Sequence, residues 1–277
     1  MGAIEVADLA MAYGELKAVD GVSFEVAEGE FFGILGPNGA GKTTTLEMVE
    51  GLRRPDAGSV RVLGESPWPR NQALLPRIGV QLQASSFFER LTAREQIHSF
   101  AALYQVPVAE ADAWLERVGL VDKADTRVEA LSGGQTQRLS IACALVHDPE
   151  VVFLDEPTAS LDPQARRNLW DLLSGLNDSG RTVVLTTHYM DEAEVLCDRV
   201  AVMDAGRILE LDSPAALIAG LAAPTRITTA DGERIETTEP TQVLSRLAAE
   251  QRLDGISVRT ATLEDVFLHL TGREYRA

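Results

Sequence analysis

The sequence predicts an α/β fold with a buried parallel sheet, an antiparallel β segment ahead of it and a small α+β unit after it. Four short apolar runs support this prediction: FFGIL (31–35), IGVQL (78–82), VVFLD (151–155) and TVVLTT (182–187). They are continuous rather than alternating, which is typical of parallel strands covered on both faces. Helical patterns separate them, and a β-rich start followed by βα units indicates the α/β class.

The elements around these runs follow from their own patterns. Residues 4–13 and 22–30 alternate between apolar and polar side chains, which predicts an antiparallel meander. Residues from about 84 to 147 have mostly helical patterns and are expected to form an insertion between two strands of the sheet. Thr92 begins one of these helices with a capping-box pattern, and residues 109–118 form another.

The pattern changes after Ser213-Pro214, so we expect a main domain over residues 1–215 and a small α+β domain over residues 216–277. The Asp231-Gly232 pair predicts a tight hairpin. A helix, a strand and a last helix are expected at about residues 241–251, 256–259 and 263–270. The last helix has an apolar face with the spacing i, i+3, i+4, i+7, formed by Leu263, Val266, Phe267 and Leu270.

Composition excludes several classes of function. The chain has 277 residues with 25 basic and 42 acidic side chains, and its net charge of −17 argues against a nucleic-acid-binding protein. Cys143 and Cys197 have no metal-binding spacing and are expected to be reduced core thiols. The first residues lack the pattern of a signal peptide, and no apolar run reaches the roughly 18 residues that a membrane span needs. Any role at a membrane is therefore expected to depend on a partner.

The segment GPNGAGKT at residues 36–43 is the strongest local signal. It follows the strand 31–35 and precedes a helical run, which is the context that the G-x-x-x-x-G-K-[ST] phosphate-binding loop requires. Its glycines allow backbone N–H groups to turn towards phosphates, and the helix N-terminus adds unpaired N–H groups and the positive end of its dipole. Lys42 is expected to reach the β and γ phosphates, and the Thr43 hydroxyl to bind Mg²⁺. The expected nucleotide-binding residues here are Gly36, Pro37, Asn38, Gly39, Ala40, Gly41, Lys42, Thr43 and Thr44.

Two acids end the buried strand VVFLD and fit the same chemistry. Asp155 is placed to hold Mg²⁺, usually through water. Glu156 follows at the carboxyl edge of the sheet, where sites of α/β proteins form, and is the candidate to orient or deprotonate the attacking water. A solvated loop is the alternative for two acids in this position, but Lys42 and Thr43 upstream favour a catalytic role.

The string LSGGQ at residues 131–135 brings the motifs together. With it, residues 1–215 resemble the ATPase subunit of an ATP-binding cassette (ABC) transporter. The resemblance implies the cassette form of the P-loop NTPase fold, with ATP and Mg²⁺ as its ligands. It assigns adenine stacking to Tyr13, and it assigns the sensing of Mg²⁺ and of the attacking water to Gln83. It also assigns the signature to Ser132, Gly133, Gly134 and Gln135, the D-loop to Ser160, Leu161 and Asp162, and a γ-phosphate contact to His188.

One position departs from the pattern of the family. Residues 80–85 read VQLQAS, where many members have a proline just before the glutamine, so Gln81 competes with Gln83 for the same role. We favour Gln83 from its register. The residues that follow, 84–88, match the region that receives short helices of the permease in the family. Ordinary packing of the helical insertion is the alternative for the two phenylalanines in that segment.

The resemblance also implies the assembly. In the family the signature of one subunit closes over the ATP held by the phosphate loop of another, so a head-to-tail dimer of this chain with two composite sites is expected. Catalysis would then depend on Glu156, His188, Gln83 and Lys42. A multi-span membrane permease is the expected second partner, which would hold the chain at the cytoplasmic face of the membrane.

The end of the chain suggests a subgroup. Residues 262–267 and Thr271-Gly272 resemble the end of drug-export ATPases of the daunorubicin-resistance type, which work with a separate permease. This implies export of a drug-like or other small molecule. The alternative is a soluble ABC ATPase without transport, such as a cluster-assembly subunit, which would leave this segment unexplained. A subunit that binds ATP without hydrolysis would need a broken site, yet Glu156 and His188 are both present.

Overall fold

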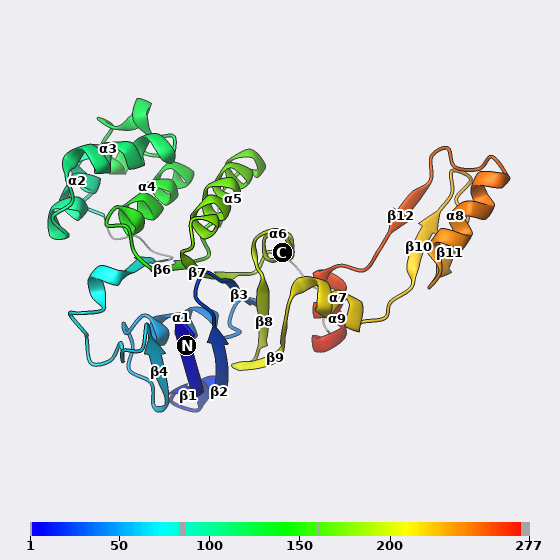
Figure 1. The fold of residues 1–277 in the computed structure, drawn as a ribbon, viewed down its shortest axis with the longest axis horizontal. Helices are drawn as coiled ribbons and strands as arrows, with labels where there is room; N and C mark the ends of the chain where they lie inside the picture. Colours follow the sequence, from blue (N-terminus) through cyan, green and yellow to red (C-terminus); the bar gives the residue numbers. More distant parts are fainter. Residues whose placement is uncertain (1, 83–86, 160, 273–277) are drawn as a thin grey trace. The chain divides into compact units, whose positions relative to one another are not determined.

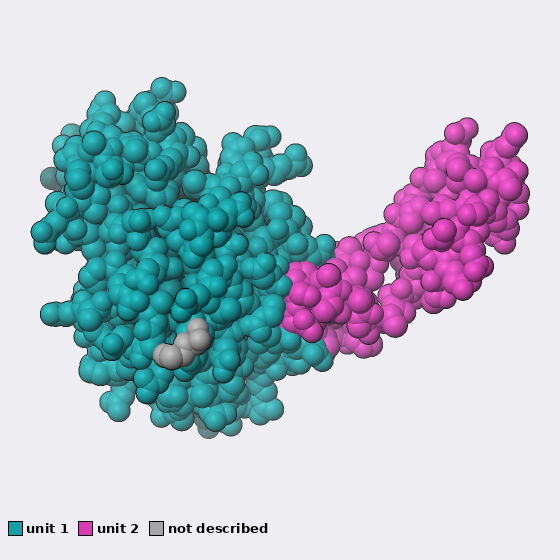
Figure 2. Space-filling view, viewed as in Figure 1, with its two compact units in different colours: residues 1–211 teal, residues 212–277 magenta. Residues whose placement is uncertain are grey.

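The computed structural model describes residues 2–82, 87–159 and 161–272. The chain divides into two compact units, residues 1–211 and residues 212–277 (Figure 2). The sequence places this boundary after residue 215. Among the described residues, two sheets belong to the first unit and one belongs to the second.

A six-stranded sheet in the order β5-β6-β7-β3-β8-β9 forms the centre of the first unit. The four continuous apolar runs become strands in it, and β5, β6, β7, β3 and β8 run parallel to their neighbours. The α/β class predicted from those runs is therefore confirmed. The strands are β3 (Phe31–Leu35), β5 (Ile78–Gln81), β6 (Val151–Asp155), β7 (Thr182–Thr187), β8 (Arg199–Asp204) and β9 (Arg207–Asp212).

Strands β8 and β9 are absent from the sequence-based prediction. They are joined by Ala205 and Gly206, which both have positive φ, 47° and 79°. This is the backbone of a two-residue hairpin turn, and the Ala-Gly pair signals it more weakly than Asn-Gly because alanine rarely adopts positive φ. Gly206 also donates its N–H to Ala40 O at 2.9 Å, which ties the hairpin to the phosphate-loop segment.

A second sheet of three antiparallel strands packs beside the first. Its order is β2-β1-β4, with β1 (Ile4–Tyr13) pairing both β2 (Leu16–Val26) and β4 (Ala57–Val62). The antiparallel pairing of residues 4–13 with 22–26 agrees with the expected meander. Strand β4 is not predicted, because only two of its six side chains are buried, which leaves little apolar alternation to recognise.

Helices cover the sheet and form a group of their own. Figure 1 shows α2, α3 and α4 gathered at the top left of the view, apart from α1. Capping boxes begin α2 at Thr92 and α4 at Ser132, the first as predicted. The helices of this unit are α1 (Lys42–Val49), α2 (Ala93–Leu103), α3 (Val108–Arg117), α4 (Gly133–Leu145), α5 (Pro163–Asp178) and α6 (Met190–Leu196).

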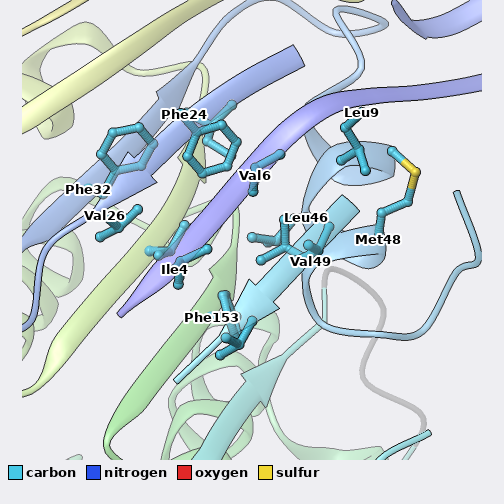
Figure 3. Close-up of a cluster of buried hydrophobic side chains, with 14 of the residues drawn as sticks. Ile4, Val6, Leu9, Phe24, Val26, Phe32, Leu46, Met48, Val49 and Phe153 are labelled. Atoms are coloured by element: carbon cyan, nitrogen blue, oxygen red, sulfur yellow. The ribbon is translucent and has the colours of Figure 1, made fainter. Parts of the chain in front are cut away.

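Helix α1 is held in place by the apolar core between the two sheets. Its inward side chains Leu46, Met48 and Val49 are at most 1% exposed and pack within a cluster that includes strands of both sheets (Figure 3). In the same cluster the rings of Phe24 and Phe32 stack with centroids 5.1 Å apart. Burying each such side chain contributes about 1.5–3 kcal/mol, so the position of α1, and of the loop before it, is strongly fixed.

The second unit combines helices with a small antiparallel sheet in the order β11-β10-β12. Five residues, 229–233, connect β10 to β11, so the Asp231-Gly232 pair lies inside a longer loop than the predicted tight hairpin. Thr229 O accepts the N–H of Gly232 and closes that loop. The elements are α7 (Pro214–Gly220), β10 (Thr225–Thr228), β11 (Arg234–Thr237), α8 (Pro240–Ala249), β12 (Ser257–Arg259) and α9 (Leu263–Thr271).

Across residues 2–82, 87–159 and 161–272, none of the helices combines the length and the apolar character that crossing a bilayer demands.

Candidate functional site

A cleft of about 480 Å³ opens where the phosphate-loop segment meets the start of α1. It brings together residues from the end of β1, the start of β2, the loop before α1, the first turn of α1, the position after β6 and the turn between β8 and β9. The residues that line it are Tyr13, Leu16, Lys17, Ala18, Asn38, Gly39, Gly41, Lys42, Thr43, Thr44, Glu156 and Ala205.

The backbone of the loop depends on glycine at two points. Gly41 caps α1 with φ 101°, and a Cβ there would lie 2.2 Å from Ala18 O. A Cβ on Gly36 would lie 2.2 Å from Met203 O. Any side chain would therefore displace the loop. Gly41 has no side chain to accept from the first amides of α1, so these N–H groups remain available to an anion.

Lys42 is turned back onto its own loop. Its Nζ donates to Gly36 O at 2.9 Å and to Pro37 O at 3.3 Å, and lies 3.2 Å from Glu156 Oε1. Lys42 and Glu156 are only 4% and 8% exposed, so this ion pair is screened little by solvent. The loop thus holds a buried cation beside Glu156, the candidate catalytic base.

Asp155 and Thr43 form an oxygen cluster at the edge of the cleft. The Thr43 hydroxyl donates to Asp155 Oδ1 at 3.3 Å, and the Thr186 hydroxyl from β7 donates to the same oxygen. Burial raises the pKa of Asp155, and the hydrogen bonds from Thr186 and Thr43 oppose that rise. Carboxylate and hydroxyl oxygens are the ligands that Mg²⁺ prefers, so this donor set fits that ion.

Glu156 has a strained backbone that aims it into the site. Its φ is 48°, which is costly for a residue with a side chain, and its N–H donates to both Thr186 O and Thr186 Oγ1 at 3.1 Å. His188 follows the end of β7, and its Nδ1 lies 3.2 Å from Glu156 Oε2. Glu156 therefore lies between Lys42 on one side and His188 on the other.

Tyr13 reaches the cleft from the last position of β1. Its ring is 45% exposed, and the guanidinium carbon of Arg53 lies 5.4 Å from the ring centroid. An exposed ring at the mouth of a cleft is available for stacking on a flat base.

The signature segment 132–135 is not among the residues that line this cleft. Ser132 and Gln135 instead cap α4, with the Ser132 hydroxyl accepting the Gln135 N–H at 3.3 Å. Asp162 caps α5 and accepts from the N–H groups of Gln164 and Ala165.

Two of the expected residues, Gln83 and Ser160, lie outside the described residues. The competing Gln81 is the last residue of β5, and its buried amide donates to Leu82 O at 2.6 Å. Thr186 is the site residue that sequence reasoning missed. The available signal was a hydroxyl near the carboxyl end of the buried strand TVVLTT, next to a strand that ends in Asp155.

The sequence and the fold of this chain are similar to those of known proteins. The sequence profile described as ABC transporter matches residues 19–159. The Nod factor export ATP-binding protein I of Paraburkholderia xenovorans (strain LB400) is 43% identical over 98% of each chain. The chain belongs to the ABC transporter family. The protein of the same name from Sinorhizobium fredii (strain NBRC 101917 / NGR234) is 39% identical over 99% of this chain and 87% of its own.

Solved structures place this ABC chain in the same fold. An ATP-binding subunit of an ABC transporter superposes with a TM-score of 0.72 at 26% identity, over 79% of this chain and 93% of its own. A dimeric ATP-binding cassette in a post-hydrolysis state with bound ADP and Pi gives 0.69 at 28% identity, over 76% and 98%. The chain is therefore an ABC cassette of the P-loop NTPase fold and an ATP-binding ATPase subunit of a transporter.

Proposed function

We propose that this chain is the ATPase subunit of an exporter whose membrane-spanning part is a separate protein. The observation that carries the proposal is the coverage of the relatives. Proteins named for export match 98% of this chain, including residues 212–277 beyond the cassette. Among the described residues of this chain, no helix is suited to crossing a membrane. Its place is then at the cytoplasmic face of the membrane, bound to its partner.

The residue roles in this proposal follow from the contacts of the cleft. The phosphates of ATP would bind the free amides at the start of α1, and Lys42 would turn from its loop carbonyls towards them. That movement separates Lys42 from Glu156, which now lie 3.2 Å apart. Once Lys42 has moved away, Glu156 would be able to accept a proton from water. ATP binding itself would therefore activate the general base.

The neighbouring residues complete the chemistry. Thr43, Asp155 and Gln83 would hold Mg²⁺, which when bound supplies charge neutralisation for the leaving phosphate. His188 lies against Glu156 at 3.2 Å and would contact the γ-phosphate. Tyr13 would stack on adenine at the mouth of the cleft.

A dimer would complete the site. Ser132 to Gln135 lie at the start of α4 and do not line the cleft of their own chain. The amides at that helix start suit a phosphate, which favours their use by a second copy in a head-to-tail arrangement with ATP between the two. Asp162, exposed at the start of α5, would belong to the same contact. ATP would then favour the closed dimer, and hydrolysis would release it.

We infer that the exported substrate is a drug-like or other small molecule. The relatives named for Nod factor export support export, and the segment 262–267 resembles the end of daunorubicin-resistance ATPases. A soluble cassette ATPase, such as a cluster-assembly subunit, is the alternative. It lacks support from any of the relatives described above.

The test is to trap the ATP-bound state and identify its partners. Glu156→Gln removes the base but keeps the size of the side chain, so ATP binding and dimer formation are expected to persist while turnover stops. The tagged variant is purified from mildly solubilised native membranes with and without ATP, and mass spectrometry identifies what accompanies it. A polytopic membrane protein supports the exporter. A normal ATP-bound dimer with soluble partners alone supports the cluster-assembly class instead.

A further inference from the structure

The guanidinium of Arg53 covers one face of the Tyr13 ring. Its central carbon lies 5.4 Å from the ring centroid, which is within the range of a cation–π contact. Tyr13 lines the nucleotide cleft, whereas Arg53 is not among the described residues that line it. These two observations place the arginine on the side of the ring away from the cleft. The face towards the cleft is left available to a flat base.

Arg53 is itself held by helix α1. Its Nε donates to Glu47 Oε2 at 2.7 Å, and its backbone N–H donates to Glu47 O at 3.0 Å. Gly51 turns the chain back between these two residues with φ 76°, and a Cβ there would lie 2.5 Å from Pro67 O. The side chain and the backbone of Arg53 therefore both bond to one residue of α1, across a turn that requires glycine.

The segment after α1 is also fastened to the end of β1. The N–H of Asp56 donates to Ala10 O at 2.9 Å, and Asp56 Oδ2 accepts the N–H of Ala12 at 2.8 Å. Ala12 directly precedes Tyr13 in the chain. The backbones that carry the arginine and the tyrosine are thus held beside each other by hydrogen bonds, so the contact between their side chains does not depend on a free loop.

Stability alone explains little of this arrangement. The side chains of Arg53 and Glu47 are 35% and 28% exposed, and exposed ion pairs contribute little to the free energy of unfolding. Tyr13 is 45% exposed, so its ring has room to leave the orientation that a base requires. Immobilising such a side chain when a ligand binds costs free energy. A cation that already holds the ring removes part of that cost.

We propose that Arg53 is a positioning residue for nucleotide binding, which holds the Tyr13 ring in the orientation that stacks on adenine. This inference rests on the proposed stacking role of Tyr13. Helix α1 then sets both ends of the site. Its first amides meet the phosphates, and Glu47, further along the same helix, orients the arginine behind the ring. The contact acts on the base alone, so it strengthens the binding of ATP and leaves the binding of inorganic tripolyphosphate unchanged.

Calorimetry on the purified chain tests this distinction. The probes are the β,γ-imido analogue of ATP, which is not hydrolysed, and inorganic tripolyphosphate, which has no base, each with Mg²⁺. Arg53→Gln is expected to weaken the binding of the ATP analogue by about 3- to 10-fold, the cost of ordering one side chain at a binding site. Its affinity for tripolyphosphate and its Tm are expected to stay at wild-type values.

Two further variants control for the charge and for the loss of an arginine. Arg53→Lys keeps a cation over the ring and is expected to bind the ATP analogue within about twofold of wild type. Arg117→Gln removes another exposed arginine that lies over a ring, with its guanidinium carbon 4.7 Å from the centroid of Trp114. This matched control is expected to bind both probes as wild type does.

A double-mutant cycle shows whether the arginine acts through the ring. Tyr13→Ala alone is expected to weaken the binding of the ATP analogue by about tenfold, because it removes the stacking surface for one base. Arg53→Gln added to Tyr13→Ala is expected to weaken binding by less than about a further twofold, since the group that the arginine positions is already gone.

Four results overturn the inference. Equal weakening by Arg53→Gln with and without the Tyr13 ring would show that the arginine acts elsewhere. Equal weakening of the two probes would assign its effect to the phosphates. Wild-type affinity of Arg53→Gln for the ATP analogue, with Tyr13→Ala still impaired, removes the arginine and leaves adenine stacking intact. Wild-type affinity of Tyr13→Ala removes both.

Discussion

Thr186→Val tests whether the hydroxyl of β7 organises the metal site. The substitution keeps the shape of the side chain but removes its bond to Asp155 Oδ1 and one of two acceptors for the Glu156 N–H. Asp155 retains the Thr43 hydroxyl at 3.3 Å, and the Glu156 N–H retains Thr186 O. A hydrogen bond to a charged group contributes about 1.5–3 kcal/mol, so we expect unfolding free energy to fall by about 2–3 kcal/mol.

The functional consequence is separate from the loss of stability. Because the Thr186 bond lowers the pKa of Asp155 against its burial, removing it raises that pKa. The carboxylate form that Mg²⁺ needs then persists only at higher pH. The acidic limb of the ATPase pH profile is therefore expected to shift to higher pH. Loss of a group that orients a metal ligand typically weakens metal binding by about 10–100-fold. We therefore expect half-maximal activity at about 10–100-fold more Mg²⁺.

Thr182→Val is the matched control. It removes another buried hydroxyl from the same strand, at the end away from the site, where Thr182 Oγ1 accepts the Gly29 N–H at 2.9 Å. This control is expected to lose about 1 kcal/mol with unaltered Mg²⁺ dependence. Chemical denaturation and steady-state ATPase assays over pH and Mg²⁺ measure both effects. If Thr186→Val merely loses stability, with the Mg²⁺ requirement and pH limb of wild type, the hydroxyl has no part in the metal site.

Three further predictions concern other parts of the molecule. Lys42→Ala removes the buried cation and should weaken ATP binding about 10–100-fold by calorimetry, since a charged hydrogen bond contributes about 1.5–3 kcal/mol; unchanged affinity contradicts the role of the phosphate loop. Ser132→Arg should leave ATP binding intact and prevent ATP-dependent dimers in light scattering, and persisting dimers argue against a shared site. Glu50→Gln should gain stability relative to wild type as pH rises. Because the pKa of Glu50 is raised in the folded state, its contribution to stability is complete below pH 4.5 and is lost as the pH rises through the native-state pKa. The difference in unfolding free energy between the variant and wild type is expected to change by up to about 1.4 kcal/mol per pH unit. A difference that stays constant across pH would show that Glu50 does not ionise in this way.

Contiguous motifs explain why much of the site was predictable. The phosphate loop, the pair Asp155-Glu156 and the cap at Ser132 each consist of residues close in the chain, so a short stretch of sequence is enough to identify them. Four strands were recognised for a similar reason, because burial on both faces makes their apolar character continuous. Strands β4 and β9 escaped prediction because they are largely exposed and offer no such run. Strand β8 was missed although its middle residues are apolar and buried.

Contacts between distant segments account for what the sequence left open. The order of the six strands brings β7 beside β6, and that neighbour relation alone lets the Thr186 hydroxyl reach Asp155. The pairing of Lys42 with Glu156 joins positions that are 114 residues apart. Glu50 has the sequence appearance of a polar residue at a helix end, yet the structure buries it.

The sequence by itself therefore determined the fold class, the family and the groups that meet a phosphate, because these depend on composition, periodicity and short motifs. Only the tertiary structure decided which acids are paired, which hydroxyl lowers the pKa of Asp155 and which buried carboxyl, that of Glu50, has no hydrogen-bond partner. The physical reason is that charge pairing and desolvation depend on distance in space. That distance is fixed by the packing of sheets and helices rather than by separation along the chain.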